Sequence, residues 1–169
     1  MVLRLLPLVL VVALTAPAAA QTSGQPGQSR RGAPQSAVLK EGIGHFDKAF
    51  YELTPKGRHD EAAVAFAAAI AAFDRELAAN PASADAHAYL ARIYAVRKDF
   101  RKAAGHYDKV AELEPFNVDA CVFAAVEYMN ANEPAEARRR LVDAKDRTLD
   151  ADVLARLDEY IARVDAFKR

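Results

Sequence analysis

The chain has 169 residues, enough for one domain with a buried core, and 52% of them are hydrophobic. Its 23 basic and 23 acidic residues give a formal net charge of zero, which argues against a nucleic acid partner. Alanine is abundant, Trp is absent, and Gly and Pro are few, which favours helices that pack closely through small side chains. We therefore expect an all-α fold.

Residues 1–20 have the pattern of a secretory signal peptide. Arg4 precedes an apolar run that ends at about Leu14, and Ala18 and Ala20 fit the small residues that precede a cleavage site. We predict cleavage after Ala20 and a periplasmic or secreted protein without a stable membrane anchor. The alternative is an uncleaved anchor, but the apolar run contains prolines and is shorter than the ~20 residues that span a bilayer.

Residues 21–37 are rich in Gln, Ser, Gly and Pro and show no apolar periodicity. Such a segment buries too little apolar surface to order itself. We predict a disordered polar linker here, followed by a folded domain at 38–169.

Cys121 is the only cysteine, so the chain cannot form an internal disulfide. A single cysteine in an exported protein is either available for an intermolecular bridge or reaction, or is a small buried hydrophobic residue. The apolar surroundings of Cys121 favour the buried alternative.

The chain repeats itself with a period of 34 residues, which is the distance from Pro81 to Pro115. Ser83 and Asn117, also 34 apart, are suitable N-cap residues, and Asp99 and Pro134 fit the start of the second helix in successive blocks. The small and large residues of the first block return 34 positions later: Leu90, Ala91, Tyr94, Ala103, Tyr107 and Val110 correspond to Ala124, Ala125, Tyr128, Ala137, Leu141 and Ala144.

This period and this pattern resemble the tetratricopeptide-repeat (TPR) family over about residues 43–168. The resemblance implies an α-solenoid of about three two-helix repeats, at about 43–80, 84–117 and 118–149. The last segment, 151–168, is predicted to be a helix that caps the array. Its apolar face consists of Val153, Leu157, Tyr160, Ile161, Val164 and Phe167.

The first repeat departs from the pattern. Its first helix is expected from Ile43 to Leu53, because apolar residues recur there with helical spacing. The closing Pro81 then comes seven residues late, which is about two helical turns. We therefore expect an elongated second helix over residues 60–79 that projects beyond the edge of the solenoid.

No pattern in the chain indicates catalysis. Four histidines, at positions 45, 59, 87 and 106, lack the spacing of metal ligands, so we assign them structural roles and expect no metal. Nucleophile elbows, phosphate-binding loops and haem motifs are absent from the sequence, so we expect no enzyme activity and no cofactor. Arg138, Arg139 and Arg140 form either an anionic-surface patch or a solvated helix face, and we favour the solvated face.

The resemblance to TPR proteins also implies that the first helix of each repeat lines a concave groove that binds a protein or peptide partner. TPRs that clamp acidic chaperone tails use Lys, Asn and Arg on this surface, but Asp47, Tyr51, Tyr89, Asp119 and Phe123 stand at those offsets here. The residues that we expect to contact a partner are Tyr51, Asp85, Ala88, Arg92, Val96, Asp119, Val122, Val126, Met129 and Asn130.

Three functions are consistent with the sequence. Our leading hypothesis is a non-catalytic interaction scaffold of the cell envelope, which binds a peptide or helical segment in the concave groove. The alternative is a structural subunit of an envelope complex that docks through helix 60–79 and the convex face. A third is an accessory binding domain for a separately encoded exported enzyme.

Overall fold

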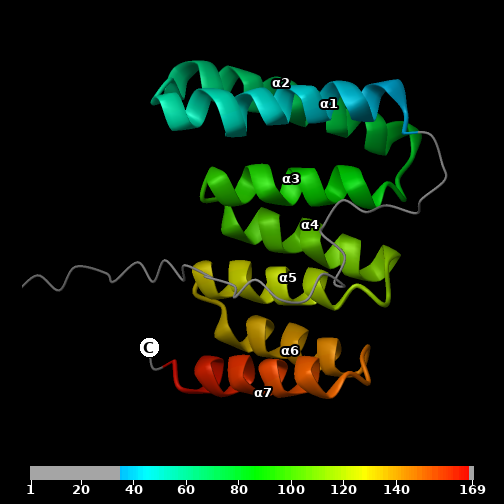
Figure 1. Cartoon of the computed structure of the whole chain (residues 1–169), viewed down its shortest axis with the longest axis vertical. Helices are drawn as coiled ribbons and strands as arrows, with labels where there is room; N and C mark the ends of the chain where they lie inside the picture. The colour runs from blue at the N-terminus through cyan, green and yellow to red at the C-terminus, as the bar shows by residue number, and fades with distance from the viewer. Residues whose placement is uncertain (1–34, 168–169) are drawn as a thin grey trace, which may run out of the picture.

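The computed structural model describes residues 35–167, which form only helices and the turns between them (Figure 1). The predicted signal peptide and the linker up to residue 34 lie outside the described residues. Between the first two α-helices the chain also forms a π-helical segment, Lys48–Leu53, and a 3-10 turn, Thr54–Lys56. The α-helices are α1 (Ala37–Asp47), α2 (His59–Ala79), α3 (Ala84–Val96), α4 (Phe100–Leu113), α5 (Val118–Asn130), α6 (Pro134–Lys145) and α7 (Ala151–Asp165).

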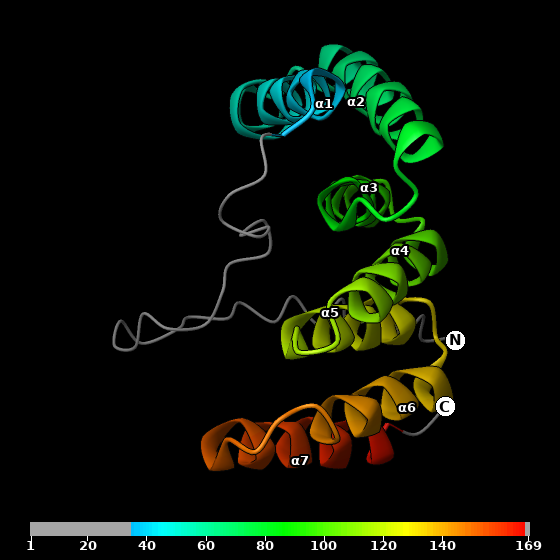
Figure 2. The same ribbon diagram turned by 90° about the vertical axis from the view of Figure 1, so that its right-hand side faces the viewer.

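The helices stack in successive pairs, which confirms the predicted all-α solenoid (Figures 1 and 2). Helices α1, α3, α5 and α7 lie on one side of the stack, and α2, α4 and α6 lie on the other. Figure 2 shows that the stack bends toward the first side. We call the surface formed by α1, α3, α5 and α7 the concave face. Within residues 35–167, every helix is too short or too polar to cross a membrane.

The same left-handed turn precedes the second helix of each of the first three pairs. In each turn a residue with positive φ is followed by a backbone N–H that bonds the carbonyl five residues earlier, which closes the C-terminus of the helix. This geometry fixes the direction of the second helix in all three pairs. The residues are Gly57 (φ 70°), Lys98 (φ 60°) and Asn132 (φ 61°), and the bonds join Arg58 to Leu53, Asp99 to Tyr94 and Glu133 to Tyr128.

Three of the residues predicted at helix N-termini are confirmed. The side chains of Ser83 and Asn117 each accept a bond from the backbone N–H three residues on, which confirms both caps. Pro134 stands in the first turn of α6, as expected. Asp99 occupies the N-cap position of α4, as predicted, but its side chain makes no capping bond and pairs instead with Lys102 at 2.9 Å.

Helix α1 begins six residues before the expected Ile43. The hydroxyl of Ser36 accepts a bond of 2.9 Å from the Leu39 N–H and caps the helix. Ser36 and Ala37, which were expected in the linker 21–37, therefore belong to the folded domain.

Helix α2 spans 21 residues, from His59 to Ala79, but it does not project freely. The predicted elongation is confirmed, but α2 does not extend alone, because its last turns pack against the early turns of α1. Phe73 is fully buried there, the Ser36 hydroxyl donates to the buried Glu76 carboxylate, and Arg75 pairs with Glu41 at 2.6 Å. The π-helical segment Lys48–Leu53 continues α1, and the two together lie along the elongated α2.

Small residues allow the helix pairs to approach closely. Ala91, Ala103 and Ala137 are completely buried, as the repeat pattern predicts. Cys121 is also buried, which confirms its interpretation as a core residue. Phe167 does not join the buried face of α7, because the helix ends at Asp165 and the Phe167 side chain remains 45% exposed.

Candidate functional site

Arg92, from the middle of α3, reaches across the concave face to the first repeat. Its guanidinium carbon lies 4.8 Å from the centre of the Phe46 ring and 5.8 Å from the centres of the Phe50 and Tyr89 rings. One guanidinium N–H bonds the Tyr51 hydroxyl at 3.3 Å. The cation therefore rests on aromatic faces, where the ring quadrupoles attract it.

The aromatic rings under Arg92 form a rigid platform. Phe46 and Phe50 stack with centroids 5.3 Å apart, and the Tyr89 ring meets Phe46 edge-on at 5.2 Å. Tyr89 also stacks on the buried Phe73 of α2 at 5.3 Å. We call Phe46, Phe50, Tyr51 and Tyr89 the aromatic platform. It couples α1 and the π-helical segment to α3, and it holds the Arg92 side chain in one place.

The guanidinium of Arg92 retains hydrogen-bonding capacity. Within residues 35–167, Tyr51 is its only hydrogen-bond partner, and Arg92 pairs with no carboxylate at ion-pair distance. A guanidinium has five N–H donors arranged as a planar fork that matches a carboxylate. The Arg92 guanidinium can therefore donate to an anionic group or a carbonyl oxygen of another molecule. Tyr51 stands beside it with 58% of its surface exposed.

A second, apolar region lies on α5. Val126 is 49% exposed, while Val122 and Met129 are half-buried and pack against the core cluster that includes Leu157 of α7. Asn130, at the end of α5, is exposed and donates to Glu127 at 3.2 Å. Burial raises the pKa of the Glu127 carboxyl.

Two of the expected groove residues do not line it. Asp85 and Ala88 are each only 8% exposed. Ala88 packs in the core cluster with Val110 and Cys121, so its side chain serves the contact between repeats. The contact with the next repeat, which the sequence offset does not take into account, explains the burial of Ala88.

The remaining expected residues are accessible to differing degrees. Val96 is 42% exposed and lines a shallow pocket of about 290 Å³ between α2 and α3, together with Thr54 and Phe66. Asp119 is half-buried in the first turn of α5. The structure therefore brings Arg92 and Tyr51 together, and places the residues of α5 in a separate region of the same face.

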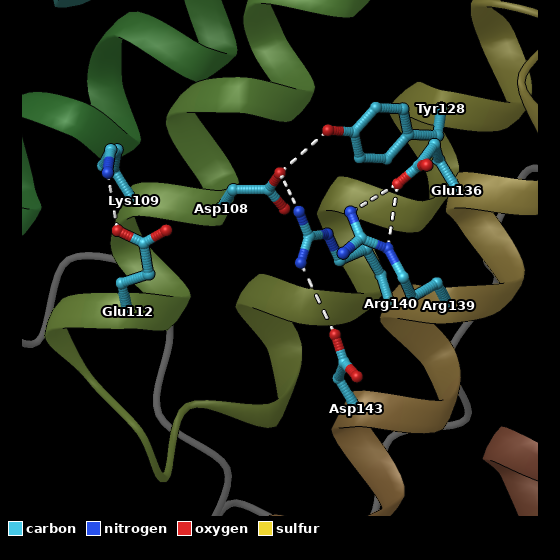
Figure 3. Close-up of polar contacts among 8 residues, drawn as sticks. All are labelled: Asp108, Lys109, Glu112, Tyr128, Glu136, Arg139, Arg140 and Asp143. Atoms are coloured by element: carbon cyan, nitrogen blue, oxygen red, sulfur yellow. Dashed lines mark hydrogen bonds and ion pairs between the residues drawn. The ribbon is translucent and has the colours of Figure 1, made fainter.

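The arginine run of α6 is paired, which the sequence did not reveal (Figure 3). Arg140 is mostly buried and bonds Asp108 of α4 at 2.6 Å, and the Tyr128 hydroxyl donates to the same carboxylate at 2.8 Å. Burial raises the pKa of Asp108 in spite of these partners. Arg139 pairs with Glu136 and Arg138 with Asp165. A solvated face therefore describes Arg138 and Arg139 but is wrong for Arg140.

Two histidines form a further cluster that sequence spacing could not predict. His87 of α3 and His106 of α4 approach to 3.0 Å, although 19 residues separate them in the chain. Among the described residues, no group of three or more His, Cys, Asp or Glu side chains is placed to hold a metal ion.

Comparison with known proteins gives structural relatives only. Neither a protein-family model nor a curated protein matches the chain. The first TPR of Spaghetti (RPAP3), solved bound to the HSP90 peptide SRMEEVD, superposes with a TM-score of 0.50 at 15% identity, over 76% of this chain and 96% of that one. The chain has the TPR fold.

A second TPR-like neighbour agrees with this result. It is the N-terminal domain of stress-induced protein-1 (STI-1) from C. elegans, with a TM-score of 0.50 and 14% identity, over 74% of this chain and 98% of that one. At such low identity the likeness concerns the path of the backbone, so the chemistry of the TPR surface must be argued from this chain's own residues.

Proposed function

We propose that this chain is a non-catalytic TPR scaffold that binds a peptide or helical segment of a partner protein on its concave face. The observation that carries the proposal is the Arg92 guanidinium, which lies on the aromatic platform with open N–H donors. Such a cation on aromatic rings, beside an exposed tyrosine, has the composition of a binding hot spot.

The partner segment should combine an acceptor group with an apolar side chain. A carboxylate or a backbone carbonyl of the segment would take the free donors of Arg92. An aliphatic or aromatic side chain about one repeat away would pack on Val126 and the edge of Met129. The two regions lie on successive first helices, so an extended or helical segment can contact both.

The bound partner should differ from an acidic chaperone tail. The RPAP3 domain is bound to the peptide SRMEEVD. In this chain Asp47, Tyr51, Tyr89, Asp119 and Phe123 occupy the positions where tail-binding TPRs are expected to carry basic and amide groups. A peptide with several carboxylates would meet two aspartates and one arginine, so we infer a segment of low net charge.

The setting that we propose is the cell envelope. The support is the signal-peptide pattern of residues 1–20, with Arg4, the apolar run and Ala18 and Ala20 before the cleavage site. The mature protein would be periplasmic or secreted, and its partner would be another exported protein.

Affinity capture tests the proposal. The full chain, immobilised, is exposed to an envelope extract, and the captured proteins are identified for the wild type, Arg92→Ala and Met129→Glu. Both variants should lose the partner while their circular dichroism spectra remain helical. Arg92→Ala removes the guanidinium donors, and Met129→Glu places a charge on the apolar region of α5. The matched control is Arg101→Ala, which removes an exposed arginine on α4. Undiminished capture by Arg92→Ala and Met129→Glu would overturn the proposal.

One observation favours the alternative, a structural subunit docked through α2. Val64 on α2 is 72% exposed and lines a shallow pocket of about 320 Å³ with Leu53 and Ala68. If Val64→Glu abolishes capture and Arg92→Ala does not, the working surface is α2 and the alternative holds.

A further inference from the structure

The imidazole rings of His87 and His106 face each other between α3 and α4. Their Nδ1 atoms lie 3.0 Å apart, and the ring centroids are 5.3 Å apart with a tilt of 40°. Only one proton fits between two nitrogens at this distance. At least one Nδ1 therefore presents a lone pair to the other ring.

Both rings are held in position by their surroundings. The Tyr94 ring stacks on His106 almost in parallel, with centroids 5.5 Å apart and an angle of 7°. The His87 ring donates a hydrogen bond to the backbone carbonyl of Pro81. A backbone carbonyl bonded to the ring is the arrangement that orients histidines bound to metals.

We propose that His87 and His106 together form a binding site for a divalent transition-metal ion, with Cu²⁺ preferred and water completing the coordination. Two imidazole nitrogens about 2.0 Å from one ion, at roughly a right angle, stand about 3 Å apart, which is the observed separation. That angle belongs to tetragonal Cu²⁺ or Ni²⁺, and imidazole binds Cu²⁺ most tightly of the common divalent ions. A shared ion requires each ring to turn from this hydrogen-bonded orientation until both lone pairs point toward the ion.

Protons compete little with a metal at this site. Burial lowers the pKa of His106 to about 4, and burial also lowers the pKa of His87. The charged groups that act on His87 are Lys109 and Glu112 of α4, and these pair with each other at 2.6 Å (Figure 3). Both rings are therefore neutral at neutral pH, which is the form that binds metals.

Metal binding also requires a change of tautomer. The proton on the donating Nδ1 leaves for solvent and another proton is taken up at Nε2 of the same ring. No net proton is released at neutral pH. With two protein ligands, the ion is held exchangeably and keeps positions open for water.

The first test titrates CuCl₂ into the full chain, without an affinity tag, by calorimetry and electron paramagnetic resonance. One Cu²⁺ per chain with nitrogen hyperfine structure is expected. His87→Gln and His106→Gln should each lower the affinity by at least about tenfold. The matched controls His45→Gln and His59→Gln should not. Two results would overturn the site. One is Cu²⁺ binding that is unchanged in His106→Gln, and the other is a wild type that binds no Cu²⁺ at about 1 mM.

A second measurement on the wild type does not depend on the stability of any variant. Paramagnetic Cu²⁺ broadens the NMR signals of nearby protons, so substoichiometric CuCl₂ should broaden the ring signals of His87 and His106 before those of the other two histidines. Earlier broadening of His45 or His59 would place the ion elsewhere and refute the proposal.

Discussion

The ring of Phe73 fills the space that a methyl group on Gly42 would need. A Cβ at Gly42 would lie 2.6 Å from Cε1 and 2.8 Å from Cδ1 of Phe73. The ring cannot retreat, because it is completely buried and stacks on Tyr89. Gly42→Ala should therefore lower the free energy of unfolding by about 1–3 kcal/mol, despite the better helix propensity of alanine. Urea denaturation measures the effect.

Gly44 in the same helix supplies the control. A Cβ there would meet no atom within 4 Å. Gly44→Ala should stabilise the protein by about 0.5–1 kcal/mol, since only the backbone entropy changes. If both variants were stabilised equally, the close packing of α1 on α2 would be refuted.

The left-handed residue in the turn after α3 offers a stabilising substitution. Lys98 holds φ at 60° without the freedom of glycine, while its counterpart Asn132 has a side chain that tolerates this region. Lys98→Gly should raise the free energy of unfolding by about 0.5–1 kcal/mol, and Asn132→Gly should raise it less. Thermal and urea melts of the two variants test this order. A loss of stability in Lys98→Gly would contradict it.

Acidification should destabilise the fold through the histidine pair. The folded state holds the pKa of His106 at about 4 and lowers that of His87, whereas unfolded histidines titrate near about 6.5. The unfolded chain therefore takes up protons first, so stability is complete above about pH 6.5 and falls as the pH drops toward 4. The urea midpoint of the wild type should be lower at pH 5.5 than at pH 7.5.

The variant His106→Gln should show a smaller difference between the two pH values, because one buried titrating ring is gone. Burial raises the pKa of Asp108 and Glu127, so these carboxyls act in the opposite sense, over a pH range that begins at their ordinary pKa values of 3.8 and 4.5 and extends upward. If the urea midpoints of His106→Gln differed between the two pH values as much as those of the wild type, other groups would control the loss of stability in acid.

Export should remove the first twenty residues. Intact-mass measurement of the exported protein should give a chain that begins at Gln21, since Ala18 and Ala20 form the cleavage pattern. A mass that still includes residues 1–20 would support the uncleaved anchor.

The sequence predicted those parts of the fold that depend on local signals. Pro81 and Pro115 gave the period, and Ser83 and Asn117 gave two helix starts that the structure confirms. The start of α1 was missed because Ser36 follows a polar segment that reads as linker, and because its role depends also on the distant Glu76.

The candidate site was harder to predict, since its features arise from contacts between helices. Offsets placed Arg92 and Tyr51 on one surface, but they could not show the stacking of Arg92 on Phe46. The same offsets placed Ala88 in the groove, although the neighbouring repeat covers it. His87 and His106 meet only because α3 and α4 run side by side, so no spacing along the chain reveals them.

The extra length of α2 has a geometric consequence for the array. The turn residues Gly57 and Lys98 are 41 positions apart, whereas Lys98 and Asn132 are 34 apart. The additional seven residues rotate a helix by roughly 700°, which falls only about 20° short of two full revolutions. The side of α2 that faces α3 therefore keeps nearly the direction that it would have without the additional residues. Two whole turns lengthen a helix along its axis but leave nearly unchanged the direction in which each side of it faces. The first layer can therefore be broader than the others.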